Sequence, residues 1–121
     1  MTNLDIQCAE LGHQLAQING MEEKVLNAAL TVLEEQGPYA MFLYVKAQHE
    51  KIARQFSEQC VGFLKRIFGS KAGDAGDVLD VVKKLAQDLR DLDDLLFARD
   101  LLRTALSYAR YHLKAKEGGS S

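Results

Sequence analysis

The stretch that decides the fold of this chain spans residues 33–48 and reads LEEQGPYAMFLYVKAQ. Near its centre stands Gly37-Pro38, which contains the single proline of the 121-residue chain. Glycine accepts the positive φ at which many helices end, and proline suits the first turn of a helix. This pair therefore predicts the end of one helix and the start of the next. Residues 39–45 are apolar on every side, which predicts a helix surrounded by protein at the centre of the core.

On both sides of this stretch, apolar residues recur at intervals of three and four, the period of an amphipathic helix. The helix that begins at Pro38 is predicted to continue to Phe68 after a break near Gln48. The same reasoning predicts four further helices and one glycine-bearing loop: helices 3–18, 22–36, 77–89 and 92–116, and the loop 69–76. We expect an all-α fold, a compact pack of five or six helices in one domain spanning residues 1–117, followed by a flexible tail at 118–121.

The composition, 47% hydrophobic and 26% charged, is ordinary for a globular domain and too apolar for a disordered chain. No stretch approaches the roughly 20 apolar residues that span a bilayer. The N-terminus carries Asp5 and Glu10 where a signal peptide would be basic and then apolar. We therefore predict a cytoplasmic location and no membrane partner. Cys8 and Cys60 fall at apolar helical positions and are predicted to be buried free thiols.

No motif for catalysis or metal binding stands out in the sequence. Sets of Glu-x-x-His pairs on several helices, which build di-metal bundles, do not occur. His49 and Glu50 begin the zinc motif His-Glu-x-x-His, but Ala53 stands where the second histidine should be. His13 and His112 fall on separate segments, so all three histidines are predicted to have structural or surface roles. We expect no enzyme, no catalytic residue, no metal site and no cofactor.

The charges are unevenly distributed along the chain. Residues 1–36 contain six acidic residues and one lysine, whereas residues 101–116 contain four basic residues and no acid. At about 100° per residue, four cations of the last helix share one stripe about 60° wide: Arg99, Arg103, Arg110 and Lys114. Such a stripe beside Tyr111 is suited to a row of phosphates, although a solvated helix face has the same pattern. Lys51, Arg54 and Lys65 form a second cationic face on the segment that precedes Phe68, opposite its apolar side.

Two segments resemble the small all-helical subunit of type III-B CRISPR effector complexes: residues 37–46 (GPYAMFLYVK) and residues 105–115 (ALSYARYHLKA). The resemblance implies a non-catalytic subunit that stacks in several copies along a ribonucleoprotein. It implies guide and target RNA and the other subunits of the complex as partners, self-association, and a role in antiviral defence. By position, it implies that Lys46, Arg110 and Lys114 face the RNA.

The first hypothesis is therefore an RNA-binding CRISPR subunit. Its predicted RNA-binding residues are Lys46, Lys51, Arg54, Arg99, Arg103, Arg110 and Lys114. The alternative is a helical adaptor that binds only protein, through residues 39–45 or through its acidic face. A helical enzyme or metal protein is the third candidate.

Overall fold

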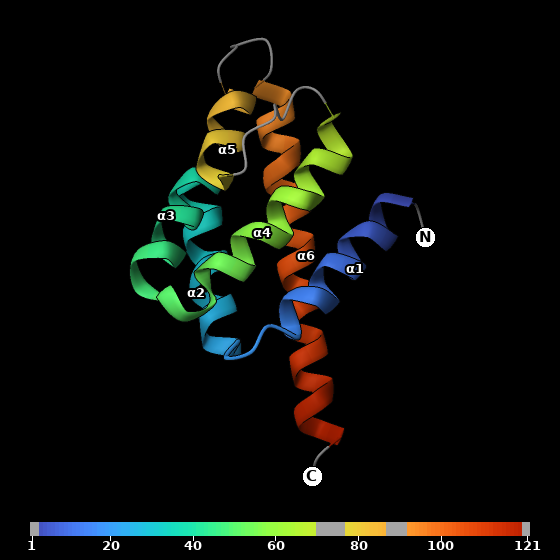
Figure 1. The fold of residues 1–121 in the computed structure, drawn as a ribbon. Helices are drawn as coiled ribbons and strands as arrows, with labels where there is room; N and C mark the ends of the chain where they lie inside the picture. Colours follow the sequence, from blue (N-terminus) through green and yellow to red (C-terminus); the bar gives the residue numbers. More distant parts are fainter. Residues whose placement is uncertain (1–2, 70–76, 87–91, 120–121) are drawn as a thin grey trace.

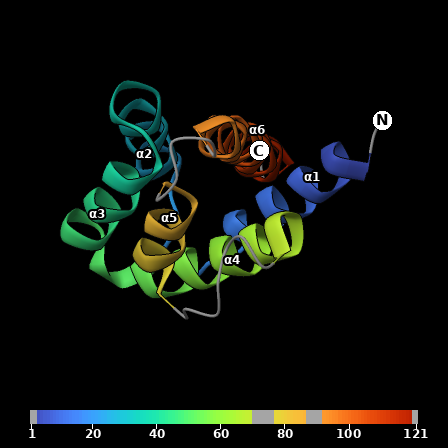
Figure 2. The same cartoon turned by 90° about the horizontal axis from the view of Figure 1, so that it is seen from above.

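The computed structural model describes residues 3–69, 77–86 and 92–119, and these residues form six helices and no strand (Figure 1). The all-α prediction is therefore confirmed. The helices are α1 (Asn3–Ala16), α2 (Glu23–Gln36), α3 (Pro38–Gln48), α4 (Glu50–Phe68), α5 (Val78–Ala86) and α6 (Leu92–Gly119). Seen from above, the longest helix, α6, lies between α1 and α2, and α4 lies across the bundle from α6 (Figure 2). Its C-terminal end extends beyond the other helices (Figure 1).

One hydrophobic cluster joins all six helices. Its fully buried side chains include Leu11, Leu26, Phe42, Phe56, Val81 and Leu102. No polar or charged side chain is buried with them among the described residues. Removing one such apolar side chain from water contributes about 1.5–3 kcal/mol, so this shared core holds the helices together. None of the described helices has the length and apolarity that a membrane span requires.

The Gly37-Pro38 turn forms as predicted. Gly37 has φ 96° and ends α2, and its N–H donates a hydrogen bond to the Leu33 carbonyl at 2.9 Å. A side chain at this φ would be strained, which is why glycine stands here. Pro38 is the first residue of α3. The turn therefore reverses the chain within a single residue between two helices.

The prediction that residues 39–45 are surrounded by protein is wrong for part of α3. Met41, Phe42 and Val45 are buried, but Leu43 is 43% exposed and Tyr44 is only half-buried. The reason lies in the position of α3 at the edge of the bundle, where α2, α4 and α5 cover only one side of it (Figure 2). A helix that is apolar on every side can therefore still expose one of its sides to solvent.

The predicted break near Gln48 is confirmed. His49 leaves the helical conformation (φ −135°, ψ 55°) and donates its N–H to the Val45 carbonyl at 2.9 Å. The His49 carbonyl in turn accepts hydrogen bonds from the N–H groups of Ile52 and Ala53, both at 3.1 Å. One residue thus caps the end of α3 and the start of α4, which lets the two helices take different directions.

The first helix ends two residues earlier than predicted, at Ala16 and not at Ile18. The Ile18 N–H bonds to the Leu15 carbonyl, three residues back, at 3.3 Å. This tighter bonding ends the α-helical pattern, as it does at the last turn of many helices. Ile18 nonetheless stays buried in the core.

The last two helices differ from the prediction mainly at their ends. The Asp77 carboxylate accepts the Leu79 N–H at 2.9 Å and so caps the start of α5. The predicted end of that helix at residue 89 and most of the loop 69–76 lie outside the described residues. Helix α6 continues to Gly119, into the predicted tail at 118–121, and residues 120–121 lie outside the described part of the chain.

Candidate nucleic-acid interface

The cationic stripe of α6 lies along the side of that helix that borders α2. Near the C-terminal end of α6, the Lys114 ammonium is 3.5 Å from a carboxylate oxygen of Glu23, at the start of α2. Near the other end, Leu95 lines a hollow together with Gln36 and Gly37, at the end of α2. The two helices therefore run antiparallel, and the stripe follows the length of their contact.

The four cations of the stripe differ in exposure and in partners. Arg103 and Lys114 are exposed, whereas Arg99 and Arg110 are half-buried. Arg103 bonds to the Asp100 carboxylate at 2.8 Å, one helical turn away. Lys114 pairs with Glu23 of α2, whereas the basic segment of α6, residues 101–116, contains no acid. Glu23 lies on α2, so no spacing within α6 could have indicated this partner.

One hydrogen-bond donor of Arg110 has no acceptor. Its Nε is buried and has no hydrogen-bond partner among the described residues. A buried donor without an acceptor costs free energy, typically about 1–3 kcal/mol. An acceptor that reached this guanidinium group would recover part of that cost.

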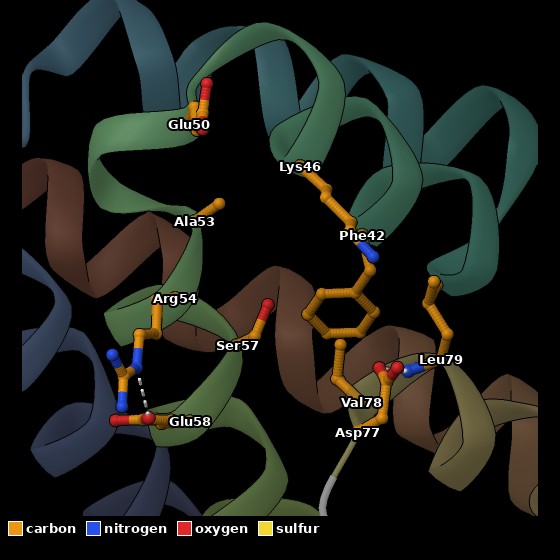
Figure 3. A pocket seen from close by; sticks show the side chains of 10 residues that line it. All are labelled: Phe42, Lys46, Glu50, Ala53, Arg54, Ser57, Glu58, Asp77, Val78 and Leu79. Atoms are coloured by element: carbon orange, nitrogen blue, oxygen red, sulfur yellow. Dashed lines mark hydrogen bonds and ion pairs between the residues drawn. The ribbon is translucent and has the colours of Figure 1, made fainter.

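Two of the other three predicted cations, Lys46 and Arg54, line a groove between α3, α4 and α5 (Figure 3). The groove encloses about 350 Å³ and is lined by Phe42, Lys46, Glu50, Ala53, Arg54, Ser57, Glu58, Asp77, Val78 and Leu79. Lys51 lines a separate hollow beside Gly20 and Glu22. The seven predicted RNA-binding residues are therefore distributed over separate surfaces, and only those of α6 form a continuous row.

The groove has mixed charge. Lys46 extends over the Phe42 side chain (Figure 3), and no described residue forms an ion pair with it. Arg54 pairs with Glu58 at 3.2 Å. Three carboxylates against two cations leave the lining with an excess of one negative charge, so it suits a phosphate less well than the α6 stripe does.

Two acidic groove residues were missed by the sequence reasoning. Glu58 follows Arg54 at the i, i+4 spacing of a helical ion pair, so the sequence contained a signal for it. Asp77 comes close only because α5 packs beside α3 and α4, and no local pattern indicates that contact.

Both cysteines are buried free thiols, as predicted. Burial, with a smaller contribution from the Asp5 carboxylate, raises the pKa of the Cys8 thiol to about 11. Burial alone raises the pKa of Cys60. At neutral pH neither thiol forms the thiolate that a nucleophile or a metal ligand needs.

The fold and the charged surfaces define an all-helical protein with a row of cations on its final helix. No group of three or more His, Cys, Asp or Glu side chains that could hold a metal occurs among the described residues. No family model, no curated protein and no solved structure matches this chain. What it does must therefore be inferred from its own residues.

Proposed function

We propose that this chain is a non-catalytic small subunit of a type III CRISPR ribonucleoprotein effector, and that it contacts the backbone of guide and target RNA through α6. Such an effector acts in the cytoplasm in antiviral defence, where the chain would contact other subunits and further copies of itself. The observation that carries the proposal is the row of four cations along the α6 stripe, Arg99, Arg103, Arg110 and Lys114. The resemblance of residues 37–46 and 105–115 to that family supports it.

The ion pairs of the stripe do not prevent phosphate binding. Arg103 and Asp100 are both about half exposed, and the Lys114 side chain is 55% exposed beside Glu23. Exposed pairs of this kind are worth about 0–1 kcal/mol. A strand of RNA presents a phosphate at every nucleotide and releases counterions on binding, so it can displace such weak partners.

Tyr111 supplies a second kind of contact next to the stripe. Its side chain is 66% exposed, the most exposed large apolar side chain among the described residues. Stacking of a base on an exposed aromatic ring is worth about 1–3 kcal/mol and tolerates any sequence. Cations for the backbone and one ring for a base together favour single-stranded RNA without sequence preference.

The test is the salt dependence of RNA binding, measured with the assembled complex or at high protein concentration. Four phosphate contacts predict a slope of log K against log salt of about −2.8, or about fifty-fold weaker binding between roughly 50 and 200 mM salt. Substituting all four stripe cations with Gln should weaken binding similarly for every RNA sequence and flatten this slope.

The matched control is a second quadruple Gln variant with the same change in net charge, at cations that are not among the seven predicted RNA-binding residues: Lys24, Arg66, Lys83 and Lys84. It should leave the slope unchanged. If the stripe variant stays folded and keeps both RNA affinity and salt slope, the stripe is only a solvated face and the proposal fails. A triple Gln variant of Lys46, Lys51 and Arg54 tests the other surfaces separately.

A helical adaptor that binds only protein is the second candidate function, and the exposure of Leu43 favours it. Leu43 is 43% exposed on α3, beside the half-buried Tyr44. Under this alternative, Leu43→Glu abolishes binding to a defined partner subunit while the fold persists, and the α6 stripe variant has no effect on any affinity. Under the RNA proposal, Leu43→Glu leaves the salt slope of RNA binding intact.

A further inference from the structure

Two of the three histidines, which lie far apart in the sequence, come together on the surface where α1 and α6 cross. The ring centres of His13 and His112 are 4.9 Å apart, with the ring planes at 64°. Both side chains are exposed. A ligand could therefore reach both rings from solvent.

One ring nitrogen of His13, Nε2, contacts the end of the Gln17 side chain. The Gln17 side-chain nitrogen lies 3.0 Å from Nε2 of His13. An amide nitrogen donates, so this contact uses the lone pair of Nε2. A metal ion bound at Nε2 would therefore replace Gln17, whose side chain is exposed and can turn away.

We propose that His13 and His112 form a two-histidine site for a late first-row divalent metal ion, of the class of Ni²⁺, Cu²⁺ and Zn²⁺. Imidazole suits these ions. Imidazole nitrogens bind such an ion at about 2.0–2.1 Å, which places the centres of two neighbouring ligand rings about 5 Å apart. The observed separation of 4.9 Å meets this requirement.

The backbone that carries the two rings is held in place by the helix crossing itself. Gly12, next to His13, lies against α6, where an added Cβ would be 2.6 Å from the Tyr108 Cβ. Only the exposed rings then need to turn for both nitrogens to face one ion, and the terminal torsion of histidine is broad. No third His, Cys, Asp or Glu completes the site among the described residues, so water would fill the remaining coordination positions.

A bound ion would tie α1 to α6, the first and last helices of the fold. Because the unfolded chain does not hold the two rings together, metal binding stabilises the folded state by mass action. This site is independent of the α6 stripe, which lies on the α2 side of the helix.

The experiment uses the full, tag-free chain and NiCl₂, with calorimetric titration for affinity and circular dichroism for thermal unfolding. The expected result is one ion per chain and a higher Tm with Ni²⁺. His13→Ala and His112→Ala should each weaken binding by at least about tenfold and remove the Tm shift, because losing a direct ligand costs at least as much as losing an outer partner.

His49→Ala is the matched control. His49 packs on Tyr44 at a ring distance of 5.5 Å, away from the pair, so its loss should change neither affinity nor Tm shift. Binding that survives both His13→Ala and His112→Ala, or the absence of one-to-one binding in the unaltered chain, overturns the proposal.

Discussion

Gly12 of α1 lies in direct contact with Tyr108 of α6. A Cβ built on Gly12 would be 2.6 Å from the Tyr108 Cβ and 2.7 Å from the Ala105 carbonyl oxygen. Both distances are shorter than any real Cβ contact, so only a residue without a side chain allows the two helices to approach this closely. The crossing also brings His13 next to His112 and buries Cys8, whose thiol donates to the Leu101 carbonyl at 3.6 Å.

Gly12→Ala should therefore destabilise the protein, although alanine is the better helix former by about 1 kcal/mol. Overpacking a close contact typically costs about 1–3 kcal/mol, and here the obstructing atoms include backbone, which cannot move aside alone. Urea unfolding measures the change. Gly62→Ala in α4 is the matched control, because its nearest neighbour is the mobile end of Arg66 at 3.7 Å. Equal stability of the two variants would contradict the tight crossing.

Phe42→Ala should lower the free energy of unfolding by about 3–5 kcal/mol. Phe42 is 1% exposed, and its ring centre is 5.8 Å from that of Phe56, so truncation leaves a cavity between α3 and α4. Leu43→Ala, one residue along the same helix, should change stability by less than about 1 kcal/mol because Leu43 is largely at the surface. Denaturant unfolding of both variants checks the pair. A small effect at Phe42 would mean that α3 does not pack as described.

Both thiols should react slowly with a disulfide reagent in the native protein at pH 8 and rapidly after unfolding. Burial holds the pKa of Cys8 at about 11 against an ordinary 9.0, and raises that of Cys60 as well. Because the pKa of Cys8 is higher in the folded state, the unfolded chain ionises first as the pH rises. The free energy of unfolding therefore keeps this contribution below about pH 9 and loses it as the pH rises toward 11. The double variant Cys8→Ala, Cys60→Ala should therefore lose less stability between these pH values than the unaltered chain. Fast reaction of the native protein would show that the thiols are accessible.

Glu23→Gln should strengthen RNA binding if the α6 stripe contacts phosphate, because it frees Lys114 from its partner. Its effect on unfolding should stay below about 1 kcal/mol, as for other partly exposed pairs. The matched control is Glu22→Gln, which makes the same change in charge next door but releases Lys24. Equal effects of the two variants on RNA affinity would point to net charge alone and not to Lys114.

The sequence by itself determined the helices and their turns, because these depend on local chemistry. The period of apolar residues follows from 3.6 residues per turn, so segments such as the one ending at Gln36 could be recognised without knowing their neighbours. Gly37 and Pro38 likewise act through their own φ preferences, and Asp77 through a bond two residues away.

Only the tertiary structure decided which faces meet. The Lys114–Glu23 pair, the exposure of Leu43 and the contact of His13 with His112 each depend on how distant helices pack. Helical spacing relates a residue only to others within a turn or two of its own helix, so it could align the four cations of α6 but could not place Glu23 of α2 beside Lys114. Side-chain surroundings across helices arise from long-range packing, which a local pattern does not contain.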